Sequence, residues 1–199
     1  MPRAGLTTDR LVAAAAELAD EAGADGVTMS ALARRFDVKD ASLYSHIRNL
    51  QELRTRLALF VGGEMTDRIA VAVAGLAGRD ALAAFAGAYR EYALQHPGRY
   101  TAGQIRVDPE VVREIAGDPA AALRRTVDLT HGMLRAYRLT EPDLTDAVRL
   151  LRSTFHGYCA LEAGGAFAAP RDVQRSWEKA VDALHTALTH WPRESAEAG

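Results

Sequence analysis

An all-α fold is what the sequence predicts. Apolar residues recur at three- and four-residue steps through most of the 199 positions, which is the period of an amphipathic helix. No segment of useful length alternates apolar and polar residues, as a half-buried strand would, and no internal repeat appears. Proline and glycine interrupt the periodic segments at places where helices commonly begin and end. These patterns together predict roughly nine or ten helices.

The first helix is expected from about Thr8 to Ala22, and Gly23 ends it. Its inward positions are Leu11, Ala14, Ala15, Leu18 and Ala22. Before it, residues 1–6 form a tail that carries Arg3. Arg3 either lies in solvent or reaches a phosphate or a minor groove.

A short helix, a tight turn and a second short helix are predicted for residues 28–46, which read TMSALARRFDVKDASLYSH. Thr28 is a good N-cap, because its side-chain oxygen accepts a hydrogen bond from a backbone N–H one turn on. In the turn, Asp37 belongs to the residue types that tolerate a left-handed backbone. Lys39 or Asp40 opens the second helix.

Apolar side chains on both short helices form a small core, with Leu32, Ala33 and Phe36 on the first and Leu43 and Ile47 on the second. The spacing of Leu43 and Ile47 leaves polar residues of the second helix facing outward, namely Lys39, Asp40, Ser42, Tyr44, Ser45 and His46. A short polar helix held on a small core is what a major groove of DNA accepts. The stretch therefore predicts a helix-turn-helix.

After Arg48-Asn49 a long helix is predicted over residues 50–73. Its inward stripe is Leu50, Leu53, Leu57, Phe60, Val61, Met65 and Ile69. Gly62-Gly63 weakens this helix in mid-course and marks a candidate hinge.

From Asp80 on, every strong segment is helical. One helix ends at His96-Pro97-Gly98, and a short segment from Arg99 to Val107 follows. New helices begin at Asp108-Pro109, Asp118-Pro119, Glu141-Pro142 and Pro170, where a proline fits the first helical turn. The inward residues of these helices are Leu82, Phe85, Tyr89, Tyr92, Leu123, Val127, Thr130, Leu134, Tyr137, Leu144, Val148, Leu151, Phe155, Tyr158, Val173, Trp177, Val181, Leu184, Leu188 and Trp191.

The composition is ordinary for a soluble globular protein, with 48% hydrophobic and 25% charged residues. Cys159 is the only cysteine, which excludes an intramolecular disulfide, and no secretory or transmembrane run is present. We therefore expect a cytoplasmic protein with no membrane partner. The formal net charge is −2, but residues 28–56 carry six Arg or Lys against three acids. This local basic excess supports the helix-turn-helix prediction.

Residues 8–60 resemble the DNA-binding domain of the TetR family of transcriptional regulators. The matching positions are Thr28, Val38, Lys39, Ser42, Leu43-Tyr44-Ser45-His46-Ile47, Asn49 and Leu53. Two positions depart from the family pattern, since Asp37 stands where glycine is common and Leu50 stands where lysine is common. The second departure removes a phosphate contact that the resemblance implies, and Arg48 is the candidate replacement.

The rest of the chain resembles, more loosely, the all-helical ligand-binding and dimerisation domain of the same family. Phe155-His156-Gly157, followed by Leu161-Glu162, is similar to an aromatic-His-Gly stretch in one subgroup of these C-terminal domains. The resemblance implies that the last two long helices, residues 142–163 and 171–191, form a four-helix bundle with their two-fold mates. Their wide apolar stripes suit that homodimer.

The expected organisation is an N-terminal helix-turn-helix DNA-binding domain over residues 1–50, linked by the helix 50–73 to a helical-bundle ligand-binding and dimerisation domain over residues 51–199. The resemblance implies a ligand-responsive regulator, most simply a repressor that binds a palindromic double-stranded operator as a homodimer and is released by a small-molecule effector. The two reading helices would enter successive major grooves about one turn of DNA apart. Activation in place of repression stays open.

Residues expected to contact DNA lie at the helix N-termini and on the outward face of the second short helix: Thr28, Ser30, Lys39, Asp40, Ala41, Ser42, Tyr44, Ser45, His46 and Arg48. Thr28 suits a phosphate oxygen as well as a purely capping role. Asp40 either accepts a hydrogen bond from a cytosine amino group or only caps its helix, and Ala41 offers a methyl-sized surface to a thymine methyl. By the resemblance, Tyr44 and His46 occupy phosphate-contact positions.

A ligand pocket is predicted from aromatic and polar-tipped side chains in the C-terminal part: Tyr89, Tyr92, Tyr100, Gln104, His131, Tyr137, Phe155, His156 and Cys159. Such a lining suits a planar, partly hydrophobic small molecule. Ordinary helix-core packing explains many of these residues equally well, and His131 and His156 are also candidates for satisfied core histidines. His185 and His190 are expected at the surface.

An enzyme is the first rival class. The sequence has no His-Glu-x-x-His pair, Cys-x-x-Cys, glycine-rich phosphate loop or Gly-x-Ser-x-Gly elbow. His156 and Cys159 lie near one helix face, but the pair lacks an oxyanion donor and an orienting group. We therefore expect no catalysis, no cofactor and no metal. A constitutive or architectural DNA-binding protein without a ligand is the second rival.

Overall fold

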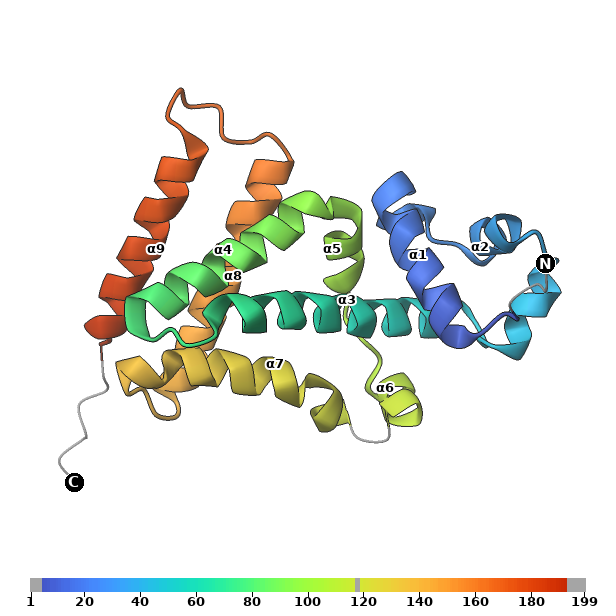
Figure 1. Cartoon of the computed structure of the whole chain (residues 1–199), viewed down its shortest axis with the longest axis horizontal. Coiled ribbons are helices and arrows are strands. Elements are labelled where there is room, and N and C mark those ends of the chain that lie inside the picture. Colours follow the sequence, from blue (N-terminus) through green and yellow to red (C-terminus); the bar gives the residue numbers. More distant parts are fainter. Residues whose placement is uncertain (1–4, 117–118, 193–199) are drawn as a thin grey trace. The chain divides into compact units, whose positions relative to one another are not determined.

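The computed structural model describes residues 5–116 and 119–192. Within those ranges the chain forms nine α-helices, three short 3-10 segments and no strand (Figure 1). The all-α prediction is confirmed. Two predicted features, the tail residue Arg3 and the helix-starting Asp118, lie outside the described residues.

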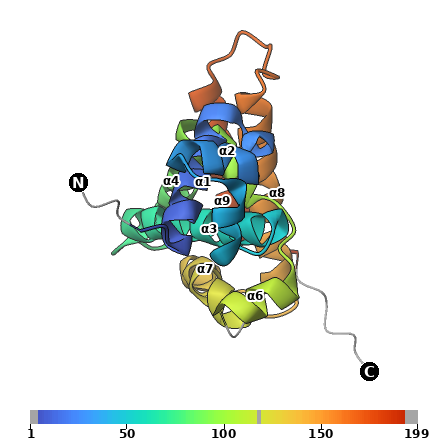
Figure 2. The ribbon, with the colours of Figure 1, turned by 90° about the vertical axis from the view of Figure 1, so that its right-hand side faces the viewer.

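The α-helices are short to medium in length, apart from the long α3. In chain order they are α1 Thr8–Ala22, α2 Met29–Phe36, α3 Leu50–Val73, α4 Gly78–Gln95, α5 Pro97–Gly103, α6 Pro109–Ala116, α7 Pro119–Leu134, α8 Asp143–Ala163 and α9 Val173–Thr189. The 3-10 segments are η1 Ala24–Gly26, η2 Asp40–Ser45 and η3 Arg135–Tyr137. Figure 2 shows α6 as a short helix separate from α7. Among the described helices, none is both long and apolar enough to cross a membrane.

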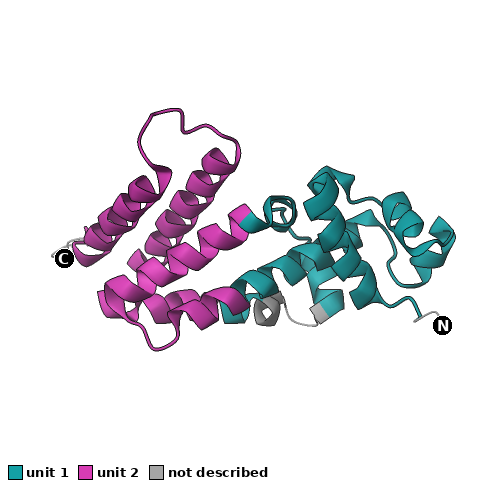
Figure 3. Ribbon diagram, turned by 45° about the horizontal axis from the view of Figure 1, so that its top comes forward, with its two compact units in different colours: residues 1–66, 95–126 teal, residues 67–94, 127–199 magenta. Residues whose placement is uncertain are grey.

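Backbone contacts divide the chain into two compact units (Figure 3). Unit 1 holds residues 1–66 and 95–126, and unit 2 holds residues 67–94 and 127–199. The domain boundary predicted near residue 50 was placed at the end of the helix-turn-helix motif, and it does not coincide with the division into these two units. That boundary stays a prediction.

The core of unit 1 joins the first helices of the chain. Leu11 of α1, Leu32 of α2 and Leu43 of η2 are fully buried, and so are Leu53 and Leu57 of α3. All five are inward positions of the predicted apolar stripes. The helical period therefore located this core correctly.

α3 runs without a break through Gly62 and Gly63 (Figure 1). The candidate hinge is thus continuous helix in this conformation, and the Thr66 hydroxyl donates to the Gly62 carbonyl oxygen at 2.7 Å. The apolar stripe gave no sign of the polar residues buried on this helix, which are Glu52, Thr55 and Thr66. A hydrophobic period reports only the apolar side chains, so their burial had to come from the structure.

α5 packs closely on α1 within unit 1. A side chain at Gly98 would place its Cβ 1.8 Å from the Ala19 carbonyl oxygen, so only glycine fits this approach. The Asp20 carboxylate accepts hydrogen bonds from the backbone N–H of Arg99 at 3.1 Å and from its guanidinium at 3.0 Å. Arg99 also pairs with Glu64 of α3 at 2.9 Å. The sequence predicted only a helix end at this place.

Aromatic rings form the core of unit 2. The ring centroid of Phe155 on α8 lies 5.6 Å from that of Tyr89 on α4, 6.1 Å from Phe85 and 5.7 Å from Trp177 on α9. Tyr158 stands 4.8 Å from Trp177 in a T-shaped arrangement. We call these five residues the aromatic cluster. Because its members come from three helices, it ties α4, α8 and α9 together.

An ion pair lies beside the aromatic cluster. The Arg90 guanidinium of α4 pairs with Glu162 of α8 at 2.5 Å and stacks over the Trp177 ring with 5.5 Å to the ring centroid. Both charged side chains are mostly buried, at 14% and 17% exposure. A buried arginine is held well in this way, because its charge is matched and its flat face meets an aromatic ring.

Predicted details of three helices are wrong. Ala22 of α1 was expected inward but is exposed. α9 begins at Val173 rather than Pro170, since Asp172 is the N-cap and its carboxylate accepts a first-turn backbone N–H at 2.8 Å. On α7, Leu123 and Val127 were expected inward but are 49% and 45% exposed. The apolar period was read correctly as a helix, but these two side chains of α7 stay exposed in the single chain.

Candidate DNA-binding interface

The first helix of the helix-turn-helix is closed at both ends as the sequence predicts. Thr28 is the N-cap of α2, and its hydroxyl oxygen accepts from the Ala31 backbone N–H at 3.1 Å. Asp37 is the C-cap, with φ 51° and ψ 50° in the left-handed region. Aspartate is among the few residues that tolerate this region, so the turn forms without the glycine common in the family.

The second short helix, η2, is a single 3-10 segment rather than an α-helix. We call residues 39–48 the recognition segment. Leu43 and Ile47 anchor it, at 0% and 1% exposure. Of the polar residues predicted to face outward, Lys39, Asp40, Ser42, Tyr44 and Ser45 are exposed and His46 is half-buried; Ala41 beside them is exposed as well. The buried anchors thus leave this face accessible at the surface.

Asp40 does not cap its own helix, and that interpretation of the sequence is wrong. Lys39 occupies the N-cap position of η2, and no side chain caps that end. The Asp40 carboxylate instead accepts a hydrogen bond from the Ser30 hydroxyl at 2.7 Å. This bond ties the start of η2 to the first turn of α2 and fixes the direction of the carboxylate.

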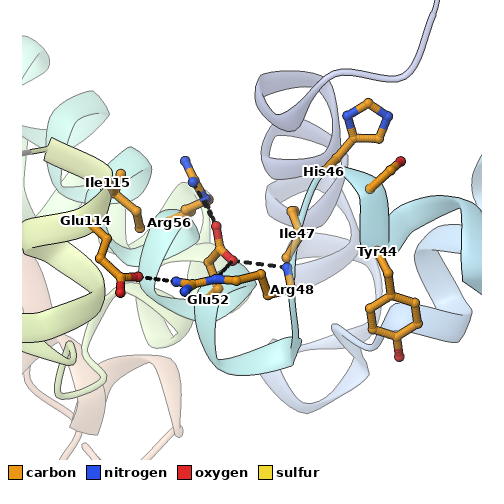
Figure 4. A pocket seen from close by; sticks show the side chains of 9 residues that line it. Tyr44, His46, Ile47, Arg48, Glu52, Arg56, Glu114 and Ile115 are labelled. Carbon is orange, nitrogen blue, oxygen red and sulfur yellow. Dashed lines mark hydrogen bonds and ion pairs between the residues drawn. The ribbon is translucent and has the colours of Figure 1, made fainter.

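A hollow lies next to the recognition segment, lined by Tyr44, Ser45, His46, Ile47, Arg48, Glu52, Arg56, Glu114 and Ile115 (Figure 4). The close-up shows the Arg48 side chain reaching from the loop before α3 toward Glu114 of α6, with Glu52 between Arg48 and Arg56. The Tyr44 ring points away from these ion pairs. Cationic and anionic side chains thus meet at the edge of the recognition segment.

Glu52 is the centre of this network. Its Oε2 accepts from the backbone N–H and the Nε–H of Arg48, both at 3.0 Å, and its Oε1 accepts from Arg56 Nε at 2.8 Å. Burial raises the pKa of Glu52, but the hydrogen bonds from Arg48 and Arg56 outweigh burial and leave the pKa below its ordinary value. The carboxylate is therefore ionised, and it holds the loop that leads into α3.

Arg48 has a second carboxylate partner. Its Nη2 pairs with Glu114, which lies 66 residues further along the chain on α6. Hydrogen bonds from Arg48 to Glu114 and to Glu52 raise the pKa of Arg48, so the guanidinium stays charged. The i, i+4 spacing of Arg48, Glu52 and Arg56 was a visible signal for part of this network. Nothing in the sequence pointed to Glu114.

The basic excess of residues 28–56 is smaller at the surface than the sequence count suggested. Arg35 pairs with Glu17 at 2.5 Å and with Glu21 at 2.8 Å, both on α1. Arg48 and Arg56 are bound to carboxylates as described above. Lys39 of the recognition segment is exposed.

The nine predicted ligand-lining residues are divided between the two units. Tyr100 and Gln104 belong to unit 1, and the other seven belong to unit 2. In unit 2, Tyr89 and Phe155 are buried in the aromatic cluster, and Tyr92 is fully buried. Ring-on-ring packing accounts for Tyr89 and Phe155. A ligand role for the set stays a prediction.

Two of the histidine predictions need correction, those for His156 and His185. His156 is exposed rather than in the core, because its position on α8 lies off the buried stripe of Phe155 and Cys159. His185 was expected at the surface but is half-buried, and the Tyr137 hydroxyl lies 3.0 Å from its Nδ1. His131 is half-buried and His190 is exposed.

Cys159 is 1% exposed and lies on the inner face of α8. Burial raises the pKa of the Cys159 thiol to about 11, so it is protonated near neutral pH. The thiolate that a thiol–imidazole pair with His156 would need is therefore absent near neutral pH.

Two family models match the chain. One, described as bacterial regulatory proteins of the tetR family, matches residues 11–57. The other, described as the tetracyclin repressor-like C-terminal domain, matches residues 82–184. The chain belongs to the TetR family. It is a DNA-binding transcriptional regulator of the helix-turn-helix type.

Relatives of known sequence or structure agree with this family. The uncharacterized HTH-type transcriptional regulator YobS of Bacillus subtilis (strain 168) is 35% identical over 175 residues, which cover 88% of this chain and 88% of YobS. BioQ, solved with its natural double-stranded DNA operator, is 22% identical with a TM-score of 0.65 and covers 93% of this chain and 99% of that one. The ActR of Streptomyces coelicolor, solved with (S)-DNPA, is 20% identical with a TM-score of 0.65 and covers 94% of this chain and 98% of that one. The two structures show that the fold is shared.

Proposed function

We propose that this TetR-family regulator is a repressor that binds a palindromic DNA operator as a homodimer and leaves it when a small molecule binds. The observation that carries the DNA half is the exposed polar face of the recognition segment on the buried anchors Leu43 and Ile47. A helix held in this way presents its N-terminal residues to base edges in a major groove. BioQ, which shares the fold, has been solved with its operator. Such a regulator works in the cytoplasm.

Each exposed residue of the recognition segment has a role in the proposal, and Arg48 at its end contacts a phosphate. Lys39 contacts a phosphate or a guanine, and Asp40, oriented by Ser30, accepts from a cytosine amino group. Ala41 packs on a thymine methyl. Four further side chains contact phosphate or base edges through a hydroxyl or imidazole group, namely those of Ser42, Tyr44, Ser45 and His46.

The first turn of α2 supplies further phosphate contacts. The Thr28 oxygen accepts the capping hydrogen bond from Ala31, so its hydroxyl hydrogen is still available to a phosphate oxygen. Capping and phosphate binding are thus compatible at one residue. The N-terminal end of α2 adds its backbone dipole to the same contact.

The homodimer is proposed to form through α8 and α9. Leu161, near the end of α8, is 51% exposed, and Phe167, in the connection to α9, is 37% exposed. Apolar side chains of this size at the surface suit burial by a second copy. Two copies then place two recognition segments on one palindrome.

The effector is proposed to be a planar, partly hydrophobic small molecule bound in the C-terminal domain. ActR, which shares the fold, has been solved with (S)-DNPA. A ligand that prefers one separation of the two DNA-binding heads lowers operator affinity by a coupling factor, and the operator lowers ligand affinity by the same factor. This reciprocity makes the ligand half of the proposal measurable from either side.

Selection of bound sequences from random double-stranded DNA tests the DNA half. We expect a palindrome with half-sites about one helical turn apart, roughly 10 base pairs. A screen of aromatic compounds for loss of binding to that palindrome tests the ligand half. A protein that binds one palindrome but responds to no compound would be a constitutive DNA-binding protein, and no sequence enrichment at all would refute the proposed function.

A further inference from the structure

We propose that Glu114 occupies the place of an operator phosphate at Arg48 and that DNA must displace it. The ion pair is then an internal competitor that sets how tightly the operator is held. This inference rests on the proposed function, and it adds a residue outside the helix-turn-helix to the control of DNA binding.

Arg48 is divided between its two carboxylate partners. Glu52, with its side chain 5% exposed, binds the backbone N–H and the Nε–H at 3.0 Å and so fixes the inner part of the arginine. Glu114, with its side chain 56% exposed, pairs with the terminal Nη2. The Arg48 side chain itself is 58% exposed. The inner partner is a permanent support, whereas the outer one takes the position that a partner in solution would use.

A phosphate can replace the Glu114 carboxylate at this position. Both groups present anionic oxygens to the same fork of guanidinium N–H donors. The hollow around Arg48 is also lined by Arg56, while the rings of Tyr44 and His46 point away from Arg48 (Figure 4). The guanidinium that binds the Glu114 carboxylate can therefore bind another anion in its place.

The ion pair joins two parts of the chain that different family models describe. Arg48 lies within the match to the N-terminal tetR model, residues 11–57, and Glu114 lies within the match to the C-terminal domain model, residues 82–184. Both residues belong to unit 1. A change in the position of α6 would therefore strengthen or break the ion pair with Arg48 at the end of the recognition segment.

The strength of the contact suits a competitor. An ion pair between two half-exposed side chains contributes little in water, so a phosphate can displace it at small cost. The cost still appears in operator affinity, because the free protein must give up the pair before Arg48 reaches DNA.

The test compares Glu114→Gln with Glu110→Gln. Glu110 is an exposed glutamate on the same helix, so the two variants lose the same charge from α6 and differ in the contact with Arg48. Fluorescence anisotropy on the selected operator should show that E114Q binds about two- to fivefold more tightly than wild type. The slope of log affinity against log salt should stay close to that of wild type, because Arg48 contacts the same phosphate in both complexes and only the ion pair of the free protein differs. E110Q should change the affinity much less than E114Q.

A double-variant cycle completes the test. In an Arg48→Gln background, E114Q should have no effect on operator affinity, because the guanidinium for which Glu114 and the phosphate compete is gone. Equal effects of E110Q and E114Q, weaker binding by E114Q, or tightening that persists without Arg48 would each overturn the inference while leaving the proposed function standing. Thermal melts of all variants check that each is folded. Failure of the wild-type protein to bind any operator would remove the proposed function and this inference together.

Discussion

The recognition segment of unit 1 and the aromatic cluster of unit 2 differ in what they leave accessible. In the recognition segment Leu43 is 0% exposed and its neighbour Tyr44 is 52% exposed. In the aromatic cluster Phe155 is 1% exposed and is surrounded by other rings. The first is a surface with internal anchors, and the second is closed on itself. An exposed surface follows from a few adjacent residues, whereas a closed cluster requires three helices to meet.

This difference explains why the two proposed partners are supported unequally. A DNA-contacting face needs side chains at the surface in a fixed local pattern, and unit 1 presents such a face. A small-molecule site needs a concave space among buried rings. Rings that pack against one another without a cavity form a hydrophobic core. The same aromatic residue types also line ligand sites, so residue type alone does not separate a core from a ligand site. The four predictions that follow test residues of the two units, in order from the largest expected effect to the smallest.

Phe155→Ala tests whether the aromatic cluster is packed core. Loss of the ring should lower the free energy of unfolding by about 3–5 kcal/mol, measured by urea denaturation, because the cavity left among the other rings is not refilled. Leu76→Ala is the control, since this apolar side chain between α3 and α4 is 45% exposed and its loss should cost much less. A small loss in F155A together with loss of effector response would instead assign the ring to a ligand site.

Lys39→Ala tests the recognition segment in the opposite way. Operator affinity should fall by about tenfold or more, while the free energy of unfolding stays within about 0.5 kcal/mol of wild type because the side chain is exposed. Arg106→Ala, which removes an exposed cation between α5 and α6, is the control and should leave operator affinity unchanged. A loss that is uniform across sequences with a shallower salt slope identifies a phosphate contact, and a loss confined to one base position identifies a guanine contact. Unchanged binding would remove Lys39 from the interface.

Glu52→Gln tests the buried support beneath the recognition segment. Since its pKa is lowered in the folded state, Glu52 stabilises the fold above its ordinary pKa of about 4.3, and this contribution disappears as the pH falls through the lowered value. Wild type should therefore lose stability on acidification below about pH 5. The E52Q variant should be less stable at pH 7 and should change less with acid, as followed by thermal melts across pH. Parallel pH profiles for the two proteins would contradict the assigned role.

Asp37→Gly and Arg138→Gly compare the left-handed C-caps of the two units. Their φ angles are 51° and 54°, so both side chains bear a steric cost that glycine avoids. Aspartate tolerates the region better than arginine, so D37G should change stability by less than about 0.5 kcal/mol and R138G should stabilise by up to about 1 kcal/mol. Denaturation midpoints of the two variants measure the difference, and a larger gain at Asp37 would reverse the argument.

The features predicted correctly from the sequence are those set within a few residues. Thr28 caps α2, Asp37 takes the left-handed turn, and Leu43 and Ile47 anchor the recognition segment because period and capping chemistry are local. The features that were missed join residues far apart. Arg48 meets Glu114 across 66 positions, and the Tyr137 hydroxyl meets His185 across 48. A hydrophobic period carries no record of such partners.

Residues for which the sequence left two roles open illustrate what local patterns decide and what they do not. Asp40, at a helix start, is compatible with a cap or with a cytosine contact, but its carboxylate accepts a hydrogen bond from Ser30, ten residues away. The outcome at Asp40 depends on a neighbour outside the local window. His156 is compatible with a ligand-lining or a core role, and its position off the buried stripe of α8 leaves it exposed.

The close approach of α5 to α1 has a consequence for building chimeric regulators. A cut after residue 57, where the N-terminal family model ends, would transplant α1 without the helix that covers it. Ala19 would then lose the backbone it touches at Gly98, and Asp20 would lose Arg99. The DNA-binding head of this chain is therefore not a freely portable module, and a graft that keeps its geometry has to carry residues 97–103 of α5 along with the first 57.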